Sequence, residues 1–187
     1  DGSAFVSTSD TDNTGAALKA GYVVINAGTR SRGIKAADGR WVGKAPAVVV
    51  DAKAAIRYLR LNDAVMPGSA ERIVITGTSG GGGLSVAIAA SGNSPDYYPY
   101  LAEIGAAGID TNGQSTIRDD VFATVAYCPI TDLGHADMAY EWMYGTVPAR
   151  SGLVNQALSR QMKDAFAAYQ ASLKLQGKRG FGTLTAD

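Results

Sequence analysis

The residues best suited to chemistry lie in one glycine-rich stretch, residues 77–81, which reads Gly-Thr-Ser-Gly-Gly. Its central residue, Ser79, follows a run of valine and isoleucine and precedes a run of small apolar residues. A G-x-S-x-G turn between a strand and a helix can hold a serine in strained backbone and lift its hydroxyl above the sheet. The N–H of Gly80 and the helix N-terminus would then face an oxyanion formed on attack. The pattern predicts Ser79 as a nucleophile and Gly80 as an oxyanion donor.

Two other interpretations of this glycine loop are weaker. A phosphate-binding loop needs a lysine and a hydroxyl after the last glycine, and Leu84 stands where the lysine should be. The stretch "TGTSGGGG" also fits the loose pattern of short-chain dehydrogenases, whose glycines approach a pyrophosphate. That family needs a tyrosine followed four positions later by lysine, and no tyrosine of this chain has one. A Rossmann-like nucleotide-binding domain stays the alternative class, beside a purely structural turn.

The elements around the serine alternate between strands and helices. Short β-branched runs predict strands at 21–28, 72–77 and 119–128, each buried on both faces of a parallel sheet. Helical patterns predict a helix beginning at Pro46, a small-residue helix ending at Gly92, a helical stretch in "HADMAYEWMYG" and a longer helix within 151–176. The alternation predicts an α/β fold with helices on both faces of the sheet.

The helix that begins at Pro46 carries both an apolar stripe and several cations. Val48, Ala52, Ala55 and Leu59 follow helical spacing and are expected to face the core. Three basic residues fall on the opposite side and are expected to be solvated: Lys53, Arg57 and Arg60. A second basic group, in the loop 29–45, is likewise expected to face solvent.

The composition excludes several classes of function. The 187 residues carry 17 basic and 17 acidic side chains, a balance that gives no electrostatic signature of nucleic-acid or membrane binding. No apolar run approaches the roughly 20 residues that cross a bilayer. The single cysteine, Cys128, allows neither an internal disulfide nor a cysteine metal site. No cofactor or metal is expected, and the compartment stays open.

Longer segments of the chain resemble a known family. "GKAPAVVVDAKAAIRYLRLND", "MPGSAERIVITGTSGGGGLS" and "CPITDLGHADMAYEW" occur in the order and spacing of bacterial tannases and feruloyl-esterase-like α/β-hydrolases, from about residue 20 to about residue 145. The resemblance implies a carboxylic ester hydrolase that acts on phenolic-acid esters such as gallates or ferulates. Ser79 would be acylated and the Gly80 N–H would bind the oxyanion. The family often has alanine where this chain has Gly80, a change that keeps the N–H.

The same resemblance implies that the chain is an incomplete piece of a catalytic domain. The family places its catalytic aspartate and histidine downstream, beyond an inserted lid. Residues 1–150 would then be part of the α/β-hydrolase domain, and residues 151–187 the start of a helical lid. The expected partners are a small phenolic ester and a complementary C-terminal piece of the same polypeptide, with an N-terminal piece as a further option.

A serine needs a base, and the chain has one histidine, His135, with Asp132 close by in sequence. In α/β-hydrolases the histidine follows the last strand, whereas His135 comes directly after the strand next to the nucleophile's. A hydrogen-bonded histidine at a helix start is therefore the favoured interpretation of His135, and a pocket or helix-cap role that of Asp132. Without a base, a catalytically inactive hydrolase-fold binding module remains a further alternative.

Overall fold

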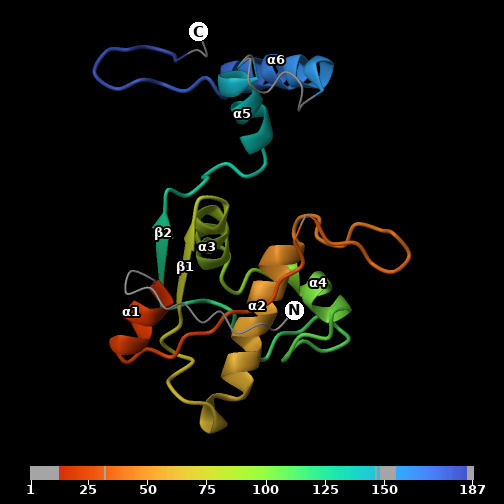
Figure 1. Cartoon of the computed structure of the whole chain (residues 1–187), viewed down its shortest axis with the longest axis vertical. Coiled ribbons are helices and arrows are strands. Elements are labelled where there is room, and N and C mark those ends of the chain that lie inside the picture. Colours follow the sequence, from red (N-terminus) through yellow and green to blue (C-terminus); the bar gives the residue numbers. More distant parts are fainter. Residues whose placement is uncertain (1–12, 32, 146, 148–154, 185–187) are drawn as a thin grey trace. The chain divides into compact units, whose positions relative to one another are not determined.

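The computed structural model describes residues 13–31, 33–145, 147 and 155–184. The chain divides into two compact units, Asp1–Pro129 and Ile130–Asp187, and each is described by itself. The first unit contains helices α1 (Asn13–Lys19), α2 (Ala47–Leu61), α3 (Gly80–Ala90) and α4 (Tyr98–Glu103), with strands β1 (Val74–Thr78) and β2 (Ala123–Tyr127) (Figure 1). Two short 3-10 turns, Asp63–Val65 and Pro95–Tyr97, belong to the same unit. The second unit contains α5 (Ala136–Tyr144) and α6 (Gln156–Leu173).

Strands β1 and β2 pair in parallel, as the alternating pattern predicts. Their register runs from Val74 opposite Ala123 to Thr78 opposite Tyr127. The carboxyl ends of both strands therefore meet at one edge, where ligands bind in open α/β sheets. Helix α3 begins at this edge, directly after β1, and packs along both strands.

The core of the first unit lies on one side of this sheet. Val49 and Ile56 from α2 and Ile88 from α3 form the buried cluster, and Ile75 of β1 packs against it. The prediction of strands buried on both faces is wrong for the described part of the chain. Val74 and Val125 point to the other face and are 44% and 43% exposed, because α2 and α3 supply their apolar side chains to one side alone.

The predicted strand at 21–28 is also absent. Residues 22–31 carry no strand assignment, and Val23 and Ile25 are 47% and 50% exposed. A strand is stable only where a neighbour takes its N–H and C=O groups, and residues 23–29 make no main-chain hydrogen bond to another described segment. The β-branched run is therefore present without the partner that would make it a strand.

Helix α2 is correctly predicted, but its buried face is not the predicted one. The buried side chains are Ala47, Val49, Val50, Lys53, Ile56 and Arg57. Lys53 and Arg57, expected in solvent, are 0% exposed, and the Arg60 side chain is 8% exposed. The two buried cations fit the core-facing side because the carboxylate of Asp119 is buried with them.

The second unit is a helical pair. Ser159 of α6 donates a hydrogen bond to Glu141 of α5 at 2.6 Å, and the rings of Trp142 and Phe166 lie 5.5 Å apart. The helix predicted within 151–176 is confirmed over 156–173. Residues 148–154, which contain the expected domain boundary at 150, lie outside the described residues, so the division into catalytic domain and lid stays a prediction.

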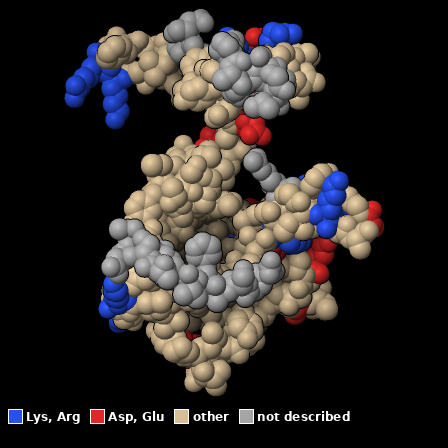
Figure 2. All heavy atoms as spheres, viewed as in Figure 1, with Lys and Arg blue, Asp and Glu red and all other residues tan. Residues whose placement is uncertain are grey.

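Charged side chains avoid the sheet and the helix that follows β1. Residues 73–90 and 121–131 contain no Asp, Glu, Lys or Arg. On the face seen in Figure 2, the surface over β1, β2 and α3 is correspondingly uncharged.

Candidate active site

Ser79 occupies the turn between β1 and α3 and is exposed. Its backbone has φ 57° and ψ −118°, a conformation that costs a non-glycine residue on the order of 1–3 kcal/mol. The Ser79 N–H donates to the carbonyl of Tyr127 at 2.9 Å, so the end of β2 holds the turn from the side. This is the strained strand-to-helix turn that a G-x-S-x-G sequence predicts.

Two glycines are required by close backbone packing at this turn. A Cβ added to Gly77 would overlap the backbone carbonyl of Gly81. A Cβ on Gly82 would lie 2.8 Å from the carbonyl oxygen of Tyr127 and 3.1 Å from Cα of Pro129. The glycines thus let the start of α3 approach its own strand and the end of β2.

Gly80 serves a different purpose. It is the first residue of α3, so its N–H has no acceptor within the helix. A Cβ at Gly80 would meet nothing within 4 Å, so alanine would fit at this position. A free N–H at a helix N-terminus favours negative charge beside it.

The first unit therefore brings together an exposed serine in a strained turn and a backbone N–H at the start of α3. The chain's one histidine, His135, belongs to the second unit. Serine needs a neighbouring base to attack at neutral pH. An exposed hydroxyl and a helix N-terminal N–H have the chemistry for the attacking and charge-stabilising parts of acyl transfer, and a base is the further requirement.

His135 lies at the start of α5 in a cluster within the second unit. Its Nδ1 is 2.9 Å from Oδ1 of Asp132, and its ring stacks on Tyr169 of α6 at 3.7 Å between centroids. The Tyr169 hydroxyl donates to Oδ2 of Asp132 at 3.2 Å. Hydrogen bonds from His135 and Tyr169 hold the pKa of the Asp132 carboxyl below its ordinary value. His135 is thus a hydrogen-bonded histidine at a helix start, as expected.

Asp132 makes these contacts in place of a helix cap, since no side-chain cap bond is present at the start of α5. Glu141 and Trp142 of α5 both contact α6, through Ser159 and Phe166. Nothing in these contacts assigns either one to a ligand.

A buried charged cluster in the first unit was not predicted from the sequence. Lys53 Nζ lies 2.8 Å from Oδ1 of Asp119, and Arg57 reaches Oδ2 at 2.7 Å. Burial by itself raises the pKa of Asp119, but hydrogen bonds from Lys53, Asn93 and Arg57 outweigh this effect and lower it. The signal was available, because Lys53 and Arg57 share a helical face with Val49, Val50 and Ile56.

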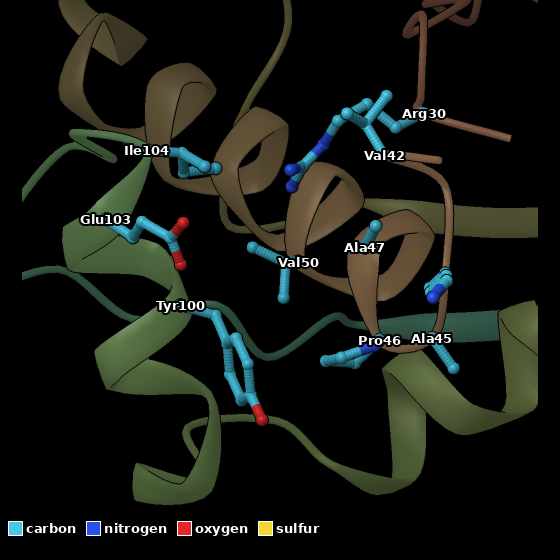
Figure 3. A pocket seen from close by; sticks show the side chains of 10 residues that line it. Arg30, Val42, Ala45, Pro46, Ala47, Val50, Tyr100, Glu103 and Ile104 are labelled. Carbon is cyan, nitrogen blue, oxygen red and sulfur yellow. The ribbon is translucent and has the colours of Figure 1, made fainter. Parts of the chain in front are cut away.

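A cavity of about 170 Å³ lies elsewhere in the first unit, between the loop before α2 and helix α4. In Figure 3 the Arg30 side chain reaches across α2. Tyr100, Glu103 and Ile104 line the cavity from α4 and its C-terminal end. Arg30 forms an ion pair with Asp51 of α2, with Nη2 of Arg30 2.8 Å from Oδ1 of Asp51. The lining of this cavity includes no residue of the serine turn, so we assign the cavity no part in the chemistry of Ser79.

Among the described residues, no three His, Cys, Asp or Glu side chains are grouped so as to hold a metal ion. The described helices also include none long and apolar enough to span a membrane. Cys128 is exposed and free.

The chain matches the family model described as BD-FAE over residues 1–174. The tannase of Fusobacterium nucleatum is 45% identical over 92% of this chain and 40% of its own, with a TM-score of 0.64. The native tannin acyl hydrolase from Lactobacillus plantarum is 41% identical over 99% of this chain and 41% of its own, with a TM-score of 0.68. A tannin acyl hydrolase in complex with ethyl gallate is 40% identical, with the same coverage and a TM-score of 0.68.

No curated protein matches the chain significantly. The chain spans about 40% of the length of the tannases to which it is similar. Its strand–serine–helix unit and parallel strands are part of an α/β-hydrolase fold. The chain therefore belongs to the BD-FAE family and is a tannase-like, feruloyl-esterase-like member of it.

Proposed function

We propose that the chain carries the nucleophile of a serine carboxylic ester hydrolase. The observation that carries the proposal is Ser79 itself: an exposed serine at φ 57° between β1 and α3, beside the unpaired N–H end of a helix. This geometry occurs in a chain of the BD-FAE family, at the sheet edge where α/β enzymes bind their ligands.

The chemical step follows from these groups. The Ser79 hydroxyl oxygen adds to the ester carbonyl carbon and gives its proton to a general base. The carbonyl oxygen becomes negatively charged and accepts a hydrogen bond from the Gly80 N–H. Collapse of this intermediate expels the alcohol, which takes the proton, and leaves the acyl group on Ser79. Water then releases the acid by the same path and restores the serine.

The substrate class is an ester of a phenolic acid, such as a gallate or a ferulate. The family and the tannases that resemble the chain support this class, as does the absence of charged side chains from residues 73–90. A neutral aromatic acyl group needs apolar walls and few polar anchors.

The acid and the histidine are supplied by sequence outside this chain. His135 is engaged by Asp132 and Tyr169 within its own unit, and its place in the sequence is too early for an α/β-hydrolase base. The complementary piece pairs a strand with the free edge of β2 and brings its histidine to Ser79. Helix α6, within residues 151–187, is the beginning of the lid.

Covalent labelling tests this function. A fluorophosphonate probe should label Ser79 in the complete active polypeptide, and peptide mapping should place the adduct on that residue. Ser79→Ala should abolish both labelling and methyl gallate hydrolysis and leave the far-UV circular dichroism spectrum unchanged.

Each competing class predicts another result. Thermal stabilisation by dinucleotides, without labelling, would support a nucleotide-binding domain. Binding of methyl gallate without turnover or labelling would support an inactive binding module. Either result in the complete polypeptide would overturn the esterase.

A further inference from the structure

The buried cluster centred on Asp119 lies at the opposite end of α3 from the nucleophile. Lys53, Arg57 and Asp119 have side chains that are 0% exposed. Lys53 Nζ donates to Oδ1 of Asp119 at 2.8 Å and to the carbonyl of Ser91 at 2.6 Å. Ser91 is the C-cap of α3, so one ammonium group ties α2 to the end of α3 and to Asp119.

Asn93 joins the same cluster through its backbone and side chain. The Asn93 N–H donates to Oδ1 of Asp119, and the Asp119 N–H donates to Oδ1 of Asn93, each at 2.8 Å. A Cβ on Gly92 would lie 2.9 Å from Cα of Asp120, so the two backbones are in direct contact. The segment after α3 is thus fixed against the segment that leads into β2.

The other end of α3 is fixed to the other end of β2. The Ser79 N–H donates to the carbonyl of Tyr127 at 2.9 Å, and Gly82 packs against the same carbonyl. Helix α3 is therefore held to β2 at both ends, and α2 supplies two cations to the end that is remote from the serine. A shift or rotation of α3 would carry the Gly80 N–H with it.

We propose that Asp119 is a positioning residue for the oxyanion donor: by fixing the C-terminal end of α3 to the start of β2, it sets where the Gly80 N–H lies relative to Ser79. The inference rests on the proposed function. An oxyanion donor acts only within about 2.7–3.1 Å of the developing charge. A displacement of about 1 Å caused far from the chemistry can cost on the order of 100-fold in rate.

The test compares two aspartates that each form an ion pair involving α2: Asp119 pairs with cations of α2, and Asp51 of α2 pairs with Arg30. Asp119→Asn removes the negative charge of the cluster and leaves the cations of Lys53 and Arg57. Asp51→Asn is the matched control, because Asp51 pairs with Arg30 from the loop before α2 and not with the cluster around Asp119. Both are made in the complete active esterase and assayed well below the lower of their two Tm values, with methyl gallate turnover and the rate of fluorophosphonate labelling as readouts.

Asp119→Asn should lower kcat about ten-fold or more with KM changed less than two-fold, and should slow labelling of Ser79 in parallel. Asp51→Asn should keep kcat and the labelling rate within about two-fold of wild type, whatever its Tm. Arg57→Lys keeps a positive charge beside the intact Asp119 carboxylate and should keep kcat closer to wild type than Asp119→Asn does. If Asp119→Asn does not fold, Lys53→Met should show the same selective loss of kcat to a smaller extent.

An Asp119→Asn or Lys53→Met protein that labels and turns over as fast as Asp51→Asn would overturn the positioning role and leave Ser79 as the nucleophile. A wild-type protein that neither labels at Ser79 nor hydrolyses the ester would overturn the proposed function, and the positioning role with it.

Discussion

The turn at Ser79 places different structural requirements on the serine and on the glycines beside it. The serine occupies a positive φ that glycine adopts more readily, and it does so while it stays exposed. The neighbouring glycines divide into two kinds: Gly77 and Gly82 allow close packing, and Gly80 presents an N–H. Glycine is therefore required for close packing at positions 77 and 82, whereas alanine at position 80 would keep the N–H.

This division predicts different costs for two glycine substitutions. Gly77→Ala should lower the free energy of unfolding by about 1–3 kcal/mol, because its Cβ would overlap the Gly81 carbonyl. Gly80→Ala should be neutral or stabilising by up to about 1 kcal/mol, because its Cβ enters open space in a helix. Urea unfolding of both variants measures the difference, and equal stabilities would contradict the packing argument.

His135 offers a second test at the residue scale. Its Nδ1 contact with Asp132 is the orientation that a catalytic triad uses, so its role has to be decided by activity. His135→Asn keeps a donor for Asp132 and should leave kcat within a few-fold and the labelling of Ser79 intact. A loss on the order of 100-fold or more, typical of a missing base, would make His135 the base of this enzyme.

At the scale of elements, α2 is the instructive case. Its extent follows from its sequence, but its orientation does not. Hydrophobic periodicity selects Val48, Ala52, Ala55 and Leu59, whereas the buried face contains Lys53 and Arg57. The apolar rule fails here because Asp119 compensates the cations, and Asp119 lies 66 residues beyond Lys53.

The buried cluster predicts an order of stabilities. Asp119→Asn leaves two buried cations without a carboxylate and should cost about 3–5 kcal/mol. Lys53→Met should cost less, because Arg57 and Asp119 remain as a neutral pair and the methionine fills the apolar part of the site. Chemical denaturation of the two variants decides the order, and a larger loss for Lys53→Met would contradict it.

The same carboxylate predicts acid sensitivity. The pKa of Asp119 is lowered in the folded chain, so its ionised form stabilises the fold above the unfolded pKa of about 3.9. That contribution is lost as the pH falls below 3.9 and through the lower folded value. Urea midpoints from pH 6 to pH 2.5 should fall less steeply for Asp119→Asn than for wild type. Parallel curves would assign the acid sensitivity to other carboxylates.

At the scale of the whole molecule, the exposed face and edges of the sheet are the dominant feature. β1 and β2 pair only with each other in the described part of the chain, and Val74 and Val125 are about half exposed. Unpaired strand edges and β-branched side chains without a covering layer are unusual in a stable α/β domain. The coverage of about 40% of the related tannases agrees with a partner layer from the same polypeptide.

Hydrogen exchange tests this arrangement. In the 187-residue chain alone, amides of β2 that do not bond to β1 should exchange rapidly, because no described strand covers that edge. In the complete polypeptide the same amides should be protected by at least ten-fold. Amides within α2 serve as the internal control, and β2 protection that is the same in both proteins would count against a paired strand.

The sequence alone determined the serine turn, α2, α3, α5, α6 and the two parallel strands, together with the resemblance to tannases. These features depend on residues within a few positions of one another, through periodicity, turn chemistry and glycine placement. The tertiary structure decided which face of α2 is buried, that residues 21–28 have no strand partner, and that His135 stacks on Tyr169. Each of these depends on groups distant in the chain, although the place of Lys53 and Arg57 on one helical face with Val49, Val50 and Ile56 was a local sign of their burial.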